Sequence, residues 1–156
     1  MRRIPADISP ELLETVKTAH IIGVHGANGS GKTYTIKEIV RKIHRGTHVQ
    51  FDCYLSKSAT KKPYFDRLRL DRLAIKIERA RPPVFLDCFI LLDVLGRMNI
   101  DRPELLIYCE RAWENPVIID HYTSREMRDT FEAYCGKWHP ERLSKPEHCF
   151  KLIYPN

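Results

Sequence analysis

Short runs of consecutive apolar residues alternate along the chain with longer stretches in which apolar residues recur every three or four positions. A short continuous run is typical of a strand that is buried on both faces of a sheet, whereas the longer spacing is typical of a helix with one apolar side. Runs that are mostly apolar lie at residues 20–24, 84–89, 105–109 and 149–154, and residues 48–53 form a further, mixed segment. We therefore predict strands at these positions and helices between them.

The predicted helices have recognisable starts and stops. Ser9 and Pro10 suit the N-cap and the first position of a helix that continues through Val16. Apolar residues recur through residues 36–43, and Gly46 is a typical stop after them. Further helices are predicted at residues 64–80, 91–97 and 124–134.

Strands that alternate with helices predict a parallel sheet covered on both faces, because each right-handed crossover packs its helix against the sheet. The predicted fold is a three-layer α/β/α sandwich around a mostly parallel five-stranded sheet. The length of 156 residues suits a single domain, 1–156. A short lid is expected at residues 111–147, in which residues 116–122 could form either an extra strand or the entry to the lid helix.

Composition narrows the classes of partner. The chain has 26 basic and 20 acidic residues, a net charge of +6, which favours anionic ligands such as nucleotides, phosphorylated metabolites or nucleic acid. Neither a membrane-spanning run nor an apolar secretory signal is apparent, so we expect a cytoplasmic protein without membrane contact. The five cysteines include no CxxC pair, which indicates neither a disulfide framework nor a zinc site.

The most informative motif is the glycine-rich stretch HGANGSGKTY between the first predicted strand and the next helix, which matches GxxxxGK[ST]. Glycines let backbone N–H groups surround phosphate oxygens, and the helix dipole adds to the attraction. Lys32 would then reach the β and γ phosphates, and the Thr33 hydroxyl would bind Mg²⁺. The predicted nucleotide-binding residues are Gly26, Ala27, Asn28, Gly29, Ser30, Gly31, Lys32, Thr33 and Tyr34. ATP is the expected nucleotide, since no NKxD motif for guanine is apparent; an empty glycine-rich turn is the structural alternative.

Two carboxylates end predicted strands on the same edge of the sheet as this loop. Asp87 follows an apolar run and is a candidate to hold Mg²⁺ through water, or it is simply a strand-end or capping residue. Asp52 ends the second predicted strand and is a candidate general base, or it is a plain turn residue.

Over most of its length the chain resembles the uridine kinase/phosphoribulokinase-like family of small P-loop kinases. The segments that carry the resemblance are IIGVHGANGSGKT, FDCY, PYFD, VFLDCFILLD, ELLIYCER, REMRD and KPEHCFKLIYP. The loop alone also resembles that of transport ATPases, but their LSGGQ signature and acidic DE pair are absent. Membership of the kinase family would make Asp52 the base and substrate ligand. It would also make Arg125 and Arg128 the lid residues that embrace the transferred phosphate; exposed helix charges are the alternative.

The sequence therefore predicts a kinase that uses ATP and Mg²⁺ to phosphorylate a hydroxyl of a nucleoside-, sugar- or vitamin-like metabolite. The basic segment 57–69 suits an anionic acceptor or is a solvated loop, and Tyr54, Tyr64 and Phe65 either stack on the acceptor or belong to the core. Two alternatives stay open: a nucleotide-binding regulatory module without transferase activity, and a polynucleotide-directed NTPase or kinase.

Overall fold

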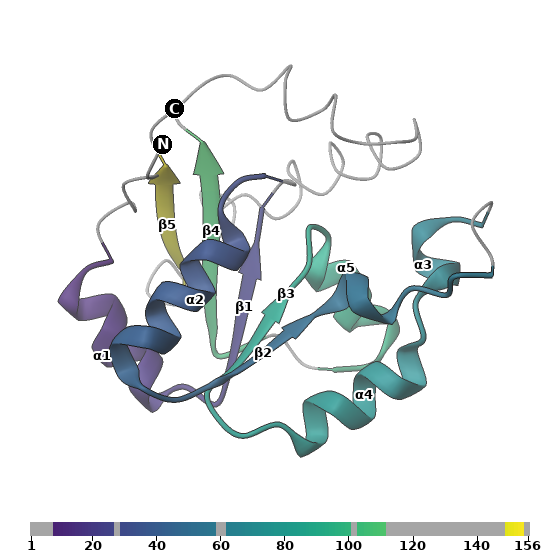
Figure 1. The fold of residues 1–156 in the computed structure, drawn as a ribbon, viewed down its shortest axis with the longest axis horizontal. Coiled ribbons are helices and arrows are strands. Elements are labelled where there is room, and N and C mark those ends of the chain that lie inside the picture. Colours follow the sequence, from purple (N-terminus) through teal and green to yellow (C-terminus); the bar gives the residue numbers. More distant parts are fainter. Residues whose placement is uncertain (1–7, 27–28, 59–61, 101–102, 112–148, 155–156) are drawn as a thin grey trace.

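The computed structural model describes residues 8–26, 29–58, 62–100, 103–111 and 149–154 (Figure 1). The strands are β1 (Ile21–His25), β2 (Thr47–Gln50), β3 (Val84–Asp87), β4 (Leu105–Arg111) and β5 (Cys149–Tyr154). The helices are α1 (Pro10–Thr18), α2 (Lys32–Ile43), α3 (Tyr64–Arg67), α4 (Leu70–Arg79) and α5 (Leu91–Arg97), with a 3₁₀ helix η1 (Phe51–Tyr54) directly after β2.

The strands form one five-stranded sheet in the order β2-β3-β1-β4-β5, and each neighbouring pair is parallel. Every residue of β3 is buried, as expected for a central strand covered on both faces. The prediction of an α/β fold with a five-stranded parallel sheet flanked by helices is confirmed.

Each face of the sheet has its own hydrophobic core. Leu12 of α1 and Ile36 of α2 pack with Phe85 on one face, whereas Leu73 of α4 and Leu95 of α5 pack on the other. Successive residues of β3 alternate between these cores, because side chains along a strand point to opposite faces. Figure 1 shows α1 and α2 together on one side, away from α4 and α5.

Helix α1 begins as its sequence predicts. The Ser9 hydroxyl accepts a hydrogen bond of 3.1 Å from the backbone N–H of Leu12, and Pro10 opens the helix. This cap satisfies one of the N–H groups that a helix leaves without an internal partner.

The predicted helix at residues 64–80 is wrong as a single element, because the chain is extended at Leu68. Leu68 forms an antiparallel bridge with Leu55, after η1. Backbone hydrogen bonds join Ser56 N to Arg67 O at 2.7 Å and Arg69 N to Tyr54 O at 2.9 Å. These bonds satisfy backbone groups that a continuous helix would have paired internally, so α3 and α4 form separately.

The second predicted strand is also shorter than residues 48–53. β2 ends at Gln50, and Asp52 therefore lies in η1 instead of at a strand end. The predicted helix at 124–134, residues 116–122, and Ala27, Asn28, Arg125 and Arg128 fall outside the described residues, as does all but one residue of the expected lid at 111–147. Across the part of the chain that is described, the structure has no helix of the length and apolarity that crossing a membrane requires.

Candidate functional site

The candidate site lies at the carboxyl ends of two neighbouring strands from which the chain continues to opposite faces of the sheet. β1 and β3 are parallel neighbours, with Val24 opposite Asp87 at their carboxyl ends. The chain leaves β1 into α2 on one face and leaves β3 into α5 on the other face. In open α/β sheets, ligands bind in the crevice that such a divergence creates.

The loop after β1 needs glycine at defined positions. Gly26 has a φ of 144°, and a Cβ atom there would lie 2.2 Å from the carbonyl oxygen of Cys109 in β4. Gly31 has a φ of 102° and is the N-cap of α2. A side chain would be excluded sterically at the first position and strained at the second.

The start of α2 differs chemically from the start of α1. No side chain caps α2 and its first turn has no acidic residue, whereas α1 has the Ser9 cap and Glu11. Lys32 and Thr33 open α2 instead. The first N–H groups of a helix point outward with a partial positive charge, so this terminus favours an anion.

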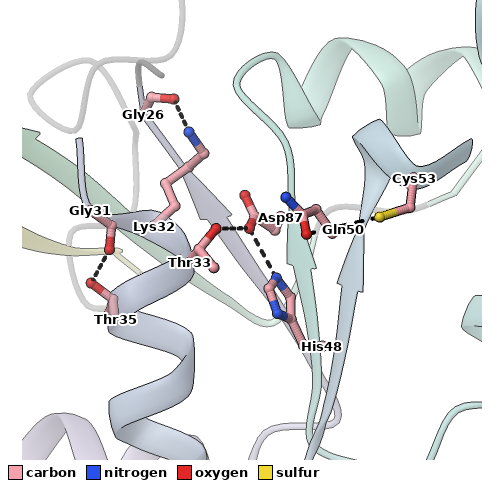
Figure 2. Close-up of polar contacts among 9 residues, drawn as sticks. All are labelled: Gly26, Gly31, Lys32, Thr33, Thr35, His48, Gln50, Cys53 and Asp87. Atoms are coloured by element: carbon pink, nitrogen blue, oxygen red, sulfur yellow. Dashed lines mark hydrogen bonds and ion pairs between the residues drawn. The ribbon is translucent and has the colours of Figure 1, made fainter. Parts of the chain in front are cut away.

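Lys32 extends back over the loop, as Figure 2 shows, and its Nζ donates a hydrogen bond of 2.9 Å to the carbonyl oxygen of Gly26. Only 8% of the residue is exposed. A lysine ammonium, which has three donors, can bind this carbonyl and still meet a phosphate oxygen. The cation is thereby held beside the N-terminus of α2.

Asp87 accepts two hydrogen bonds at one oxygen. The Thr33 hydroxyl lies 3.0 Å from Asp87 Oδ2, and Nε2 of His48 lies 2.9 Å from the same atom (Figure 2). Asp87 is 5% exposed. The structure thus brings together Thr33 and Asp87, the predicted metal residues, and adds His48, which our sequence reasoning missed. The contact of His48 with Asp87 depends on β2 lying beside β3, and no local sequence pattern indicates that these strands pair.

Asp52, in η1, is held by a side chain of α3. The Tyr64 hydroxyl donates a hydrogen bond of 2.7 Å to Asp52 Oδ1 and lies 3.7 Å from Cys88 Sγ. Tyr64 is buried and meets Phe89 edge to face, with 4.9 Å between ring centroids. Burial, with the neighbouring Cys88 and Asp52, raises the pKa of Tyr64 well above its ordinary value, so the phenol remains a donor at neutral pH.

Lys32, Thr33, Asp52 and Asp87 face one pocket of about 370 Å³, a volume within the range of small-molecule sites. Of the predicted residues, Gly29, Gly31, Lys32, Thr33, Tyr34, Asp52 and Asp87 line it. Lys37, Gln50, Cys88 and Phe89 complete the lining. No described residue of segment 57–69 lines the pocket.

Several predicted residues lie apart from the pocket. Ser30 is 1% exposed, and its hydroxyl has no hydrogen-bond partner among the described residues. Tyr64 belongs to the hydrophobic core, and Tyr54 and Phe65 pack against that core. The core alternative for these aromatic residues is therefore the one that the structure supports.

The oxygen donors at the site suit a hard cation. Within the described residues, no group of three or more His, Cys, Asp or Glu side chains is placed to hold a metal. Thr33 and Asp87 instead offer a hydroxyl and a carboxylate, and Mg²⁺ is typically bound by one or two such groups together with phosphates and water. No protein-family model matches the chain, and no curated protein matches it either.

Proposed function

We propose that the protein is a kinase that transfers the γ-phosphoryl group of ATP to a hydroxyl of a small molecule. One observation carries this proposal. A single pocket brings together the N-terminus of α2, which no side chain caps, the ammonium of Lys32 and the carboxylate of Asp52. The first pair suits the phosphates, and the carboxylate suits the hydroxyl that attacks them. The loop motif and the resemblance to the uridine kinase/phosphoribulokinase-like family support the same reaction.

At the phosphate end, the amides of the loop and of the first turn of α2 bind the β and γ phosphates. Lys32 Nζ, now 2.9 Å from Gly26 O, would reach the phosphate oxygens. Because Lys32 is almost fully buried, its charge is screened less by water than that of a surface lysine. This arrangement stabilises negative charge that develops on the leaving group.

Thr33 and Asp87 would hold Mg²⁺, which when bound neutralises charge on the β and γ phosphates. Thr33, which lines the pocket, can donate its hydroxyl hydrogen to Asp87 and still use a lone pair of the same oxygen to bind a cation. The two side chains therefore act together, and each sets the orientation of the other.

At the acceptor end, Asp52 takes the proton of the acceptor hydroxyl. Tyr64 occupies Oδ1, and no described residue occupies Oδ2, which leaves that oxygen as the proton acceptor. As the proton moves to Asp52, the acceptor oxygen forms a bond to the γ phosphorus and the bond from that phosphorus to the β–γ bridging oxygen breaks. The products are ADP and a phosphate ester.

The test is phosphoryl transfer from γ-labelled ATP with Mg²⁺ to pooled nucleosides, sugars, vitamins and short oligonucleotides, for wild type and Asp52→Asn. Asparagine has the shape of aspartate and can still accept from Tyr64, but it cannot take a proton. Asp71→Asn, at an exposed position of α4, is the matched control. The kinase proposal expects label in a small molecule from wild type and the control, and little from Asp52→Asn.

ATP binding without any labelled product would contradict the kinase and favour a regulatory module. Label that enters only oligonucleotides would favour the polynucleotide-directed alternative, and binding would then weaken steeply with salt.

A further inference from the structure

His48 reaches the site from the strand beside Asp87. In β2 and β3, His48 is opposite Phe85, and Gln50 is opposite Asp87. Phe85 packs in the core on the α2 face, so His48 and Asp87 both point to that face as diagonal neighbours. Thr33 approaches from α2 itself, as Figure 2 shows.

The two contacts use the same atom of Asp87. A carboxylate oxygen has two lone pairs, and Oδ2 accepts from Thr33 Oγ1 at 3.0 Å and from His48 Nε2 at 2.9 Å. An ionised carboxylate only accepts, so this contact requires the hydrogen of the imidazole on Nε2. Both lone pairs of Oδ2 are then used, and among the described residues Oδ1 has no hydrogen-bond partner.

Two donors fix the rotation of the carboxylate more firmly than one. With Thr33 alone, the group could turn about its last torsion angle and exchange its oxygens. With His48 as well, Asp87 presents Oδ1 on the side away from these donors (Figure 2). Groups that orient metal-binding carboxylates in this way typically matter for metal affinity by about 10- to 100-fold.

We propose that His48 is a positioning residue, which together with the Thr33 hydroxyl holds Asp87 so that Oδ1 meets the hydrated Mg²⁺ that accompanies the nucleotide. This inference rests on the proposed function, because it assumes that Mg²⁺ enters with ATP. Neither the loop motif nor the family resemblance assigns a role to His48.

The test is the Mg²⁺ dependence of binding of a non-hydrolysable ATP analogue, measured by calorimetry. His48→Leu introduces an apolar side chain of similar bulk and removes the N–H donor, and we expect the half-saturating Mg²⁺ concentration to rise about 10- to 100-fold. Binding of the analogue without metal should be unchanged. His48→Gln places an amide N–H near the position of Nε2 and should bring the Mg²⁺ requirement back to within a few-fold of wild type.

His20→Leu is the matched control, because His20 is exposed and precedes β1 at the opposite end of the strand. It should leave the Mg²⁺ requirement unchanged. Thermal unfolding of each variant confirms that the protein titrated is folded, and His48→Gln tests the proposal even if His48→Leu does not fold.

Three results have distinct meanings. An unchanged Mg²⁺ requirement in folded His48→Leu would overturn the role of His48. With Mn²⁺ as the probe, a paramagnetic resonance spectrum of wild type that shows coupling to an imidazole nitrogen would also overturn it, because His48 would then be a ligand. Failure of wild type to bind the analogue with or without Mg²⁺ would instead contradict the proposed function.

Discussion

The hydroxyl of Tyr64 and the carboxylate of Asp52 lie 2.7 Å apart, with the phenol buried and the aspartate exposed. The pair connects η1, which follows β2, with α3. Because Leu55 and Leu68 also pair between these segments, the position of Asp52 is set by a small tertiary unit and not by the strand before it.

Tyr64→Phe should slow phosphoryl transfer while nucleotide binding stays unchanged. The phenylalanine ring fills the same space, but Asp52 loses the donor that orients it. A misplaced catalytic group typically costs up to about 100-fold in rate. Loss of one hydrogen bond should lower the free energy of unfolding by only about 1 kcal/mol. Steady-state kinetics and calorimetry separate the two effects, and an unaltered rate in a folded variant would mean that Tyr64 is merely structural; Tyr54→Phe is the control.

Lys32→Ala should reduce phosphoryl transfer by at least about 100- to 1,000-fold, the effect typical of one preorganised donor at developing negative charge. The variant should fold, since alanine suits the first turn of a helix. Lys42→Ala removes an equal charge from an exposed position near the end of α2 and should be nearly silent. Comparable turnover in the two variants would contradict a role for Lys32 in transfer.

The parts of this site that sequence could predict are local ones. Gly26, Gly31, Lys32 and Thr33 belong to a motif predicted between a strand and a helix, and the structure has Gly26 after β1, Gly31 at the N-cap of α2, and Lys32 and Thr33 at its start. The apolar runs likewise located the strands, including Asp87 at the end of β3.

The features that the sequence could not predict depend on pairing between segments that lie far apart along the chain. The strand order places β2 beside β3, and only this brings His48 to Asp87. The interruption between α3 and α4 has the same origin, because apolar periodicity continues through residues 64–80 while Leu68 pairs with Leu55.

Gly26→Ala should destabilise the protein by at least about 2 kcal/mol, because a φ of 144° is strained for alanine and its Cβ would meet the Cys109 carbonyl. Gly96→Ala is the matched control. Gly96 lies in α5 with open space around its missing Cβ, so alanine there should stabilise the helix by about 0.5–1 kcal/mol. Denaturant unfolding measures both changes, and equal stabilities would show that the loop does not have this backbone geometry.

Stability should decline in alkaline solution. Burial raises the pKa of Cys88 to about 12 and that of Cys109 to about 11, so both thiols stay protonated in the folded chain while the unfolded chain ionises them above about pH 8.5. The unfolded state then binds fewer protons, and each thiol should lower the free energy of unfolding by about 2 kcal/mol between pH 8.5 and 10.

Unfolding by denaturant across this pH range checks the effect. The double variant Cys88→Ala, Cys109→Ala should show a flatter pH dependence, whereas Cys53→Ala, at an exposed position, should retain the slope of wild type. The same slope in all three proteins would assign the alkaline loss to other groups.

The divergence of the chain at β1 and β3 has a thermodynamic consequence. A ligand in the pocket touches α2, which is anchored in one core, and also Phe89, which belongs to the other. Ligand at 100 times its dissociation constant stabilises a folded protein by about 2.7 kcal/mol. Here that gain is shared by both layers, so occupancy should make them open together as one cooperative unit and slow amide hydrogen exchange on both faces of the sheet.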